Sequence, residues 1–300
     1  MTAADGPRGS SISLSAFCKV NLCLEITGRR DDGYHDLATV FQSVSLADAV
    51  TIEAREEPGL SVSVPDGGAP EGAANLCWQA AEAYQAERGW PGGVAVTLDK
   101  RVPSGAGLGG GSSDAAAVLR GLAELDRAPL SQSVLEEIAR GLGADVPFFL
   151  TGGTAVATGR GDQITSLPDL PACRILLVRP DLEISTAEAF GMLSESDFTD
   201  GERASSMADA IAAGAAGEIP AHVFNGFSRV LEERWPVLGE LKRAMADHGA
   251  IAAEITGSGS AVFGIFDDHA AALASGEALA ERGHWARLTE PVPCGTLMAE

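Results

Sequence analysis

The sequence predicts an α+β protein built in two halves, and three observations support this fold class. Strand-like alternation and helical periodicity are mixed along all 300 residues, without the regular strand–helix–strand order of a parallel α/β sheet. A chain that is 45% hydrophobic and 21% charged has the composition of a folded protein. Two prolines within Leu167–Pro171 mark a break, so we expect one domain over residues 1–166 and a second over residues 167–300.

The first half begins with Ile12–Ile26, whose alternating apolar residues predict one or two strands, followed by a turn at Thr27–Gly33. Asn75 and Ser131 are expected to cap helices, because a side-chain oxygen there accepts a hydrogen bond from the first helical turn. The other predicted elements are a strand pair, Val50–Ala54 and Leu60–Val64, joined through Pro58-Gly59; a loop, Pro65–Ala74; a strand, Val94–Leu98; helices Asn75–Arg88, Ser112–Leu125 and Ser131–Leu142; and a hairpin, Thr154–Thr165, that turns at Gly159–Gly161.

The sequence of the second half predicts shorter strands that lie between helices. Its expected elements are a strand, Arg174–Val178; helices Thr186–Leu193 and Ser205–Ala216; one or two helices within Phe224–His248, broken at Pro236; strands Ala252–Ile255 and Ala261–Phe266 around a Gly-Ser turn; a helix near Asp268–Arg282; and a last strand near Trp285–Leu288.

The charge balance limits the partners. Lysine and arginine number 21 against 42 acidic residues, a net charge of −21, which repels nucleic-acid phosphates and acidic membrane surfaces. We therefore expect a small-molecule partner, with no nucleic acid and no membrane. Five cysteines without a CxxC pair favour a reducing cytoplasm over a disulfide or zinc framework. Met1–Ser11 has no hydrophobic segment of the signal-peptide kind and is predicted to be a short tail.

The strongest candidate site is a glycine-rich segment between a predicted strand and a predicted helix. It consists of Pro103, Ser104, Gly105, Ala106, Gly107, Leu108, Gly109, Gly110, Gly111, Ser112 and Ser113. Glycine lets the backbone approach a ligand, and a helix start offers unpaired N–H groups, so the segment predicts a cradle for a nucleoside triphosphate. It matches neither the Walker A nor the dinucleotide pattern. The structural alternative is a flexible linker before a capped helix.

Four further segments each admit two interpretations. Asp145 precedes an apolar run, so it either has a chemical role or ends a helix by bonding nearby backbone. Lys19 is either a functional cation or an edge-strand charge. Tyr34 and His35 offer a stacking face and a hydrogen-bonding ring for a base, or form a polar hairpin tip. The turn at 256–260 either supports the glycine-rich segment or is a plain β-turn. No histidine cluster predicts a structural metal.

These segments, in this order, resemble the GHMP small-molecule kinases. The resemblance covers about residues 11–266 and is carried by Gly-Leu-Gly-Gly-Gly-Ser-Ser at 107–113, Gly-Tyr-His at 33–35, Gly-Ala-Asp-Val-Pro at 143–147 and Thr-Gly-Ser-Gly at 256–259. The N-terminal stretch is most similar to the branch that acts on 4-diphosphocytidyl-2-C-methyl-D-erythritol in non-mevalonate isoprenoid biosynthesis. The resemblance implies phosphoryl transfer from ATP, accompanied by Mg²⁺, to the 2-hydroxyl of that substrate. It also implies a nucleotide-binding N-terminal half and a ferredoxin-like C-terminal half.

The resemblance assigns roles residue by residue. Lys19 and Asp145 match the catalytic pair, and the segment from Pro103 to Ser113 matches the ATP loop. Asp145 would orient the acceptor hydroxyl, either as a base or as an electrostatic anchor. The residues that match the substrate side are Asn21 near the substrate, Tyr34 and His35 as the cytosine pair, and Thr186 and Phe190 as the second wall, with Phe190 stacking on the cytosine opposite Tyr34. Ser113 is the one candidate named for the Mg²⁺ ligand, and the oligomeric state is left unassigned.

Two departures from the family pattern fall in the second half. Thr-Gly-Ser-Gly-Ser-Ala at 256–261 stands where the family more often has Ser-Gly-Ser-Gly-Pro-Thr, and Asn225-Gly-Phe stands where it usually has Asn-Asp. Two other functions stay open: a kinase of the same family with a mevalonate- or homoserine-like acceptor, and a non-catalytic nucleotide sensor. Gly-Tyr-His with Phe190 favours a cytosine, and the retained Lys19 and Asp145 favour catalysis.

Overall fold

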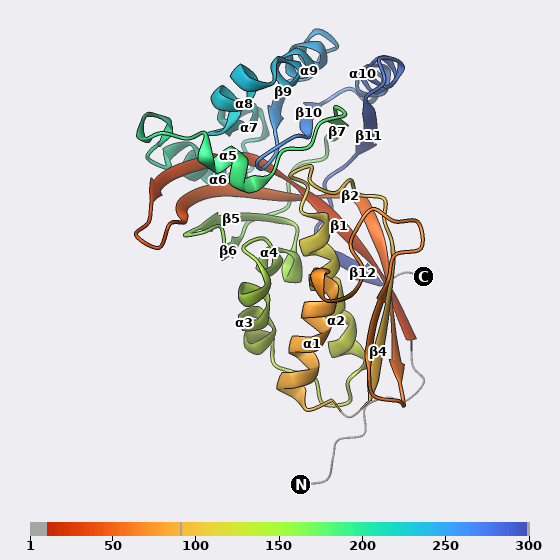
Figure 1. Ribbon diagram of the computed structural model, residues 1–300. Helices are drawn as coiled ribbons and strands as arrows, with labels where there is room; N and C mark the ends of the chain where they lie inside the picture. Colours follow the sequence, from red (N-terminus) through yellow and green to blue (C-terminus); the bar gives the residue numbers. More distant parts are fainter. Residues whose placement is uncertain (1–10, 91, 299–300) are drawn as a thin grey trace.

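The computed structural model describes residues 11–90 and 92–298, and two sheets with their helices form its frame (Figure 1). The predicted tail over Met1–Ser11 lies outside the described residues except for Ser11. The α+β class is confirmed, because antiparallel pairing dominates both sheets and the helices are not inserted strand by strand. No helix in the described parts of the chain is apolar and long enough to cross a membrane.

The larger sheet is built on two long antiparallel strands, β1 (Ser11–Arg29) and β2 (His35–Arg55). Their register shifts between Phe17 and Cys18 and again beyond Asn21, so bulges flank the short segment that carries Lys19. A bulge re-aims the side chains beside it. The sheet order is β12-β1-β2-β4-β3, with β5 added beside β2, β6 beside β5 and β8 beside β1. The bounds are β3 (Leu60–Ser63), β4 (Gly93–Asp99), β5 (Thr154–Thr158), β6 (Gln163–Ser166), β8 (Phe224–Asn225) and β12 (Thr296–Met298).

Four helices pack together beside this sheet (Figure 1). They are α1 (Leu76–Arg88), α2 (Gly110–Leu125), α3 (Gln132–Leu142) and α4 (Val146–Thr151), with a short 3₁₀ turn η1 (Gly72–Ala74) before α1. Helix α2 lies between α1, α4 and the two long strands, and its Ala115–Leu119 segment is fully buried. Small alanines let α2 approach the sheet closely, which fixes where its N-terminus emerges.

The smaller sheet has the antiparallel order β11-β7-β10-β9 and lies at the opposite end of the molecule (Figure 1). Its strands are β7 (Arg174–Arg179), β9 (Ala252–Ile255), β10 (Val262–Phe266) and β11 (Trp285–Thr289). The helices of this half are α5 (Thr186–Gly191), α6 (Glu202–Ala212), α7 (Ile219–His222), α8 (Ser228–Arg234), α9 (Pro236–Asp247) and α10 (His269–Glu281), with 3₁₀ turns η2 (Glu195–Asp197) and η3 (Ala216–Glu218).

Several local predictions are confirmed. The Asn75 side chain accepts a hydrogen bond from the Cys77 N–H and caps α1. The hairpin β5–β6 turns at Gly159–Gly161, and the helical stretch of the second half breaks where α9 begins at Pro236. Ser131 stands at the N-cap of α3, but its hydroxyl lies 3.0 Å from the Ser133 Oγ and makes no capping bond.

The predicted strand pair Val50–Ala54 and Leu60–Val64 is wrong, because β4 lies between these strands. β3 runs parallel to β4, and β4 pairs antiparallel with β2. The prediction also missed the first part of β2, where Thr39–Val44 is buried throughout. Both faces of this stretch are covered, so the alternation of a half-exposed strand is absent.

The second half also departs from the predicted elements. Phe224–Asn225 is a short strand beside β1 instead of a helix start, and α6 begins at Glu202 and ends at Ala212. In the first half, α2 begins two residues before the predicted Ser112. The chain also continues past β11 to β12, which pairs with β1. Two strands from beyond residue 166 thus complete the larger sheet.

Candidate active site

A cleft of about 990 Å³ brings the candidate residues together. Its lining combines the glycine-rich segment with Gly33–His35, Arg140–Asp145, part of α5 and the turn Gly257–Gly259. Every site residue predicted from the sequence lines this cleft except Ser113. Ser113 is fully buried, and its hydroxyl donates to the Phe17 carbonyl at 2.7 Å, so it anchors α2 to β1.

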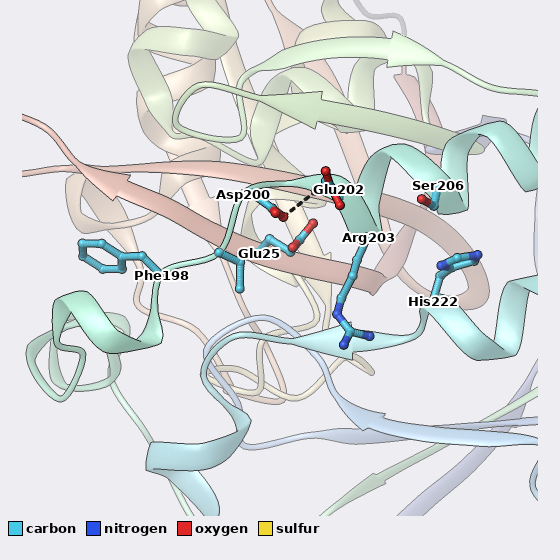
Figure 2. Close-up of a pocket in the computed structure, with 8 residues that line it drawn as sticks. Glu25, Phe198, Asp200, Glu202, Arg203, Ser206 and His222 are labelled. Atoms are coloured by element: carbon cyan, nitrogen blue, oxygen red, sulfur yellow. Dashed lines mark hydrogen bonds between the residues drawn. The ribbon is translucent and has the colours of Figure 1, made fainter.

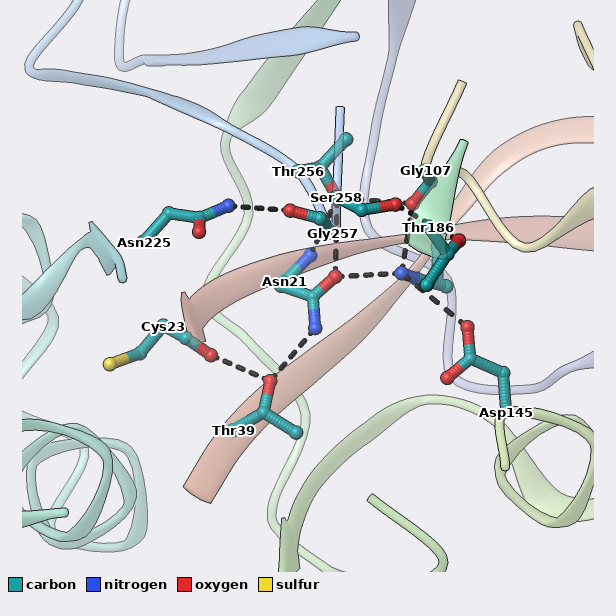
Figure 3. Close-up of polar contacts among 11 residues, drawn as sticks. Asn21, Cys23, Thr39, Gly107, Asp145, Thr186, Asn225, Thr256, Gly257 and Ser258 are labelled. Carbon is teal, nitrogen blue, oxygen red and sulfur yellow. Dashed lines mark hydrogen bonds and ion pairs between the residues drawn. The ribbon is translucent and has the colours of Figure 1, made fainter. Parts of the chain in front are cut away.

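Lys19 lies at the base of this cleft. The side chain is 3% exposed on β1, an interior strand, so the interpretation as an edge-strand charge is wrong. Its Nζ donates to the Asn21 Oδ1 at 2.6 Å and to the Gly107 carbonyl at 2.8 Å. The Asp145 Oδ2 lies 3.7 Å from Nζ, an ion pair longer than a hydrogen bond (Figure 3). Two of the three Nζ N–H groups thus make hydrogen bonds, and the third is paired only with this more distant carboxylate.

The two members of this ion pair differ in their exposure to solvent, because Lys19 is buried and Asp145 is partly exposed. Burial lowers the pKa of Lys19, while the nearby Asp145 carboxylate opposes that change. Asp145 is about one-third exposed to the cleft, with 35% of its side chain accessible. It stands at the N-cap of α4, yet its side chain makes no capping hydrogen bond. The carboxylate is thus free to bind a ligand group rather than to end a helix.

Asn21 connects the two halves at the same place (Figure 3). Its N–H donates to the Thr256 Oγ1 at 3.0 Å, and its Nδ2 donates to the Thr39 Oγ1 at 2.8 Å. The Thr39 hydroxyl donates in turn to the Cys23 carbonyl. The backbone N–H and the side-chain Nδ2 of Asn21 are therefore both held by hydrogen bonds. This fixes the position of its Oδ1, which accepts from Lys19.

The turn at 256–260 packs directly on the glycine-rich segment. The Ala261 N–H donates to the Ala106 carbonyl at 3.1 Å. Gly107 has φ +75°, and a Cβ there would stand 2.2 Å from the Thr256 carbonyl oxygen. Only glycine allows this contact. Of the two interpretations of this turn, the structure favours the one in which it supports the glycine-rich segment.

Asn225 fixes this turn from the other side. Its Nδ2 donates to the carbonyls of Ile255 and Gly257 at 2.8 Å each, while its Oδ1 accepts from the Phe227 N–H. Asn225, which the family pattern also has at this position, thus has a structural role. The glycine that follows it, Gly226, packs against Ile26. The sequence did not predict this bracing, because its partners lie about 30 residues away.

The glycine-rich segment ends in the N-terminus of α2. Gly109 occupies the N-cap position with φ +71° and has no side chain to cap the helix. The first N–H groups of α2 therefore lack side-chain partners, and Gly110–Ser112 line the cleft. Free N–H groups and the positive end of a helix dipole are features that suit this segment to bind an anion.

A buried ionic trio lies beside this segment and was not predicted from the sequence. Lys100 pairs with Asp48 and with Asp114, the latter at 2.6 Å. Asp48 also accepts hydrogen bonds from the backbone N–H groups of Arg101 and Val102. The Asp114 Oδ1 is buried without a partner. Burial raises the pKa of Asp114 to about 7, against the attraction of Lys100.

Aromatic rings form the opposite end of the cleft. His35 stacks on Phe190 with ring centroids 4.7 Å apart and planes at 22°. Tyr34 is 58% exposed, and the Arg160 guanidinium lies over its ring at 5.1 Å. The structure thus places His35, rather than Tyr34, against Phe190. Thr186 lies beside the turn, with its Oγ1 3.2 Å from the Ser258 Oγ (Figure 3).

Fold and site together define a small-molecule kinase, and the comparisons agree. The profile of the GHMP kinases N terminal domain matches residues 75–153, and that of the GHMP kinases C terminal matches residues 207–284. The chain belongs to the GHMP kinases and, within them, to the family of 4-diphosphocytidyl-2-C-methyl-D-erythritol kinases, as its relatives show.

Two curated relatives with that name illustrate this membership. The protein of Caldicellulosiruptor saccharolyticus is 39% identical over 266 residues, which cover 89% of this chain and 92% of the relative. The protein of Geobacter sulfurreducens is 38% identical over 275 residues, covering 92% and 97%. A crystal structure of 4-(cytidine 5'-diphospho)-2C-methyl-D-erythritol kinase matches with TM-score 0.81 and 36% identity, covering 93% of this chain and 98% of that one. Homoserine kinase from Cytophaga hutchinsonii shares the fold, with TM-score 0.79 at 18% identity, covering 96% of this chain and 97% of that one.

Proposed function

We propose that this protein transfers the γ-phosphoryl group of ATP to the 2-hydroxyl of 4-diphosphocytidyl-2-C-methyl-D-erythritol, a step of non-mevalonate isoprenoid precursor biosynthesis. The observation that best supports this function is the Lys19–Asp145 pair, whose charged atoms are 3.7 Å apart. The pair lies in one cleft with an uncapped helix N-terminus and an aromatic wall. The relatives that share the chain's length carry this activity in their names.

The phosphates bind the glycine-rich segment and the N-terminus of α2. Phosphoryl transfer depends on positioning and charge stabilisation, with little covalent work for the protein. Backbone N–H groups of Gly110–Ser112 supply donors without adding a flexible side chain. Gly107 and its contact with the 256–260 turn keep the segment in shape while ATP binds.

Lys19 and Asp145 act on the acceptor hydroxyl. The hydroxyl oxygen forms a bond to the γ-phosphorus, the bond from phosphorus to the β–γ bridging oxygen breaks, and ADP leaves with that electron pair. Asp145 orients the hydroxyl and accepts its proton, since its carboxylate faces the cleft without a capping hydrogen bond. The remaining Nζ N–H of Lys19 stabilises the charge on the transferred group.

The residues of the cleft fit a magnesium ion that arrives with ATP. The described residues hold no group of three or more carboxylate, histidine or cysteine side chains able to enclose a metal. Mg²⁺ commonly keeps several waters and binds through one or two protein oxygens and the substrate phosphates. Ser112 and Asp145 have oxygen-bearing side chains beside the phosphate site. When bound, the ion neutralises phosphate charge.

The cytosine end of the substrate binds the aromatic wall. Burial lowers the pKa of His35, and Arg29 lowers it further, which favours the neutral imidazole. A neutral imidazole offers one donor and one acceptor, which suits the mixed edge of cytosine. Tyr34 presents a stacking face, Phe190 backs His35, and Thr186 and Asn21 lie nearer the transferred group.

The remaining assignments are proposals of the same kind. We keep a division at residues 166 and 167 between the ATP-binding unit and the second unit, with β8 and β12 as the second unit's contribution to the larger sheet. Cytoplasmic action is supported by five free cysteines. A small molecule is the partner, and nucleic acid and membrane are not.

The test is an assay with Mg-ATP and 4-diphosphocytidyl-2-C-methyl-D-erythritol that follows ADP and the 2-phosphate. 2-C-methyl-D-erythritol 4-phosphate, which lacks the cytidylyl group, and homoserine are the control acceptors. Asp145→Asn keeps the size of the side chain and should lower kcat at least about a hundredfold while ATP still binds. Turnover with homoserine alone, or full activity of Asp145→Asn, would refute the proposal.

A further inference from the structure

The His35 ring is held by two phenylalanines from one segment of the second half. Phe190 stacks on its face, and Phe198 meets it edge-on with ring centroids 5.9 Å apart at 74°. Phe190 in turn rests edge-on against Phe227 at 4.9 Å. The outer torsion of a histidine side chain is broad and nearly two-fold, so packing decides where its ring nitrogens point. Two contacts at a large angle to each other fix the ring plane.

The segment that carries Phe198 is anchored on β1 just beyond Ile26. The Thr199 N–H donates to the Ile26 carbonyl at 2.9 Å, an interaction outside regular strand pairing. Gly201 approaches Ala38 and Thr27 so closely that a Cβ would be in contact with both. The segment thus follows β1 and β2 at the level where His35 begins β2.

The main anchor is Glu25, a buried carboxylate that the proposed reaction does not use. Glu25 is 1% exposed, and its Oε2 accepts a hydrogen bond from the Ala204 N–H at 2.9 Å. Ala204 lies in the first turn of α6, whose own N-cap residue is Gly201 and offers no side chain. Glu25, which lies on β1, therefore takes the place of the missing N-cap side chain and faces the positive N-terminal end of α6.

Figure 2 shows this arrangement from the pocket behind β1. Glu25 lies below the start of α6, Phe198 lies at the far end of the connecting segment, and the Arg203 side chain extends away from Glu25. Arg203 instead places its guanidinium over the Phe224 ring at 4.8 Å. Glu25 is thus committed to the helix start rather than to an ion pair.

We propose that Phe198, held in place by Glu25, is a positioning residue that fixes the imidazole of His35 for the base of the substrate. The inference rests on the proposed function, since His35 is assigned there to the cytosine. Loss of Phe198 frees the imidazole to rotate and weakens binding of the cytidine end. Neither residue lies among the groups that line the phosphate site, so ATP binding stays unchanged.

The experiment compares Phe198→Leu, Glu25→Ala and Glu25→Gln with the wild-type chain. For Phe198→Leu we expect KM for 4-diphosphocytidyl-2-C-methyl-D-erythritol to rise about three- to tenfold, the effect of a lost aromatic pair. kcat and KM for ATP should stay within about twofold. Glu25→Ala should behave likewise, and Glu25→Gln should restore most of the affinity because its amide oxygen still accepts from Ala204.

A second readout reports on the ring itself. The Cε1–Hε1 signal of His35 in an NMR spectrum, assigned with His35→Gln, should move in Phe198→Leu and in Glu25→Ala. The matched control is Phe224→Leu, a half-buried phenylalanine beside the same helix that touches Arg203 and not His35. It should leave the His35 signal and both KM values unchanged.

The outcomes separate the two proposals. Wild-type turnover of the cytidine substrate, with an unchanged KM and an unmoved His35 signal in Phe198→Leu, would overturn this inference alone. An equal rise of both KM values would also overturn it, because that is the result of a general loss of structure. Wild-type protein that does not turn over the cytidine substrate would overturn the proposed function and this inference together.

Discussion

Asp114 gives the chain a stability that depends on pH, and Asp114→Asn tests it. Asp114 is 1% exposed, shares Lys100 with Asp48, and has one oxygen without a partner. Asp48 accepts three hydrogen bonds, from Lys100 and the Arg101 and Val102 N–H groups, so it is the better-stabilised anion. Asp114 has the Lys100 ammonium as its one hydrogen-bond donor among the described residues. Burial raises its pKa to about 7 from an ordinary value of 3.8.

The sign and size follow from proton linkage. A carboxyl whose pKa is higher in the folded than in the unfolded chain binds extra protons when folded, so its protonation stabilises the fold at low pH. That contribution is lost as pH rises through about 7. At about 1.4 kcal/mol per pKa unit, the loss between pH 5 and pH 8 is about 2–3 kcal/mol. In Asp114→Asn the side chain carries no titrating proton, so the variant shows no such loss.

Urea unfolding at pH 5, 6, 7 and 8 measures the effect in both proteins. The free energy of unfolding of the wild type should fall about 2–3 kcal/mol more than that of Asp114→Asn over this range. Histidines and other groups are common to both proteins, so the difference isolates position 114. Asp48→Asn is the contrasting variant and should be destabilised at every pH, because its neutral amide places an NH₂ group where an oxygen accepts from the buried Lys100 ammonium. Parallel pH curves for wild type and Asp114→Asn would refute the reasoning.

Three further variants probe the cleft. Arg160→Ala should raise KM for the cytidine substrate about two- to fivefold, the strength of an exposed cation–π contact with Tyr34, and leave KM for ATP unchanged. Gly107→Ala should weaken ATP binding in calorimetry more than Gly105→Ala, because both have positive φ but only at 107 does a Cβ meet the facing turn; equal losses would mean that backbone strain alone matters. Asn225→Ala should lower the free energy of unfolding by about 2–3 kcal/mol in urea, since two carbonyls lose their donor, and an unchanged midpoint would contradict its bracing role.

The glycine-rich segment was predictable from the sequence because its function is local. Five glycines, three before α2 and two in its first turn, specify free N–H groups wherever the rest of the chain lies. Lys19 and Asp145 stood out as polar residues in apolar surroundings, although the 3.7 Å between them joins positions far apart in the chain. The sequence therefore singled out both residues, and only the fold shows that they lie together.

The missed elements lack a local pattern. Thr39, Gln42 and Ser43 are buried polar residues that interrupt the hydrophobic run of β2, and their hydrogen-bond partners lie elsewhere: Thr39 donates to Cys23, and Gln42 accepts from Thr154. Strand β12 has two exposed residues, and its pairing depends on the chain returning to β1. Non-local pairing of this kind leaves no periodicity to detect.

The distribution of lysine explains why a chain of net charge −21 needs so many glycines at an anion site. Each of its three lysines lies next to carboxylates: Lys19 beside Asp145, Lys100 between Asp48 and Asp114, and Lys242 between Glu232 and Glu254. Their charges are largely neutralised before any ligand arrives. Under the proposed function, most donors for the triphosphate then come from the backbone N–H groups and the dipole of α2, with Lys19 acting on the transferred group. Glycine exposes those groups, and the 256–260 turn holds them in place.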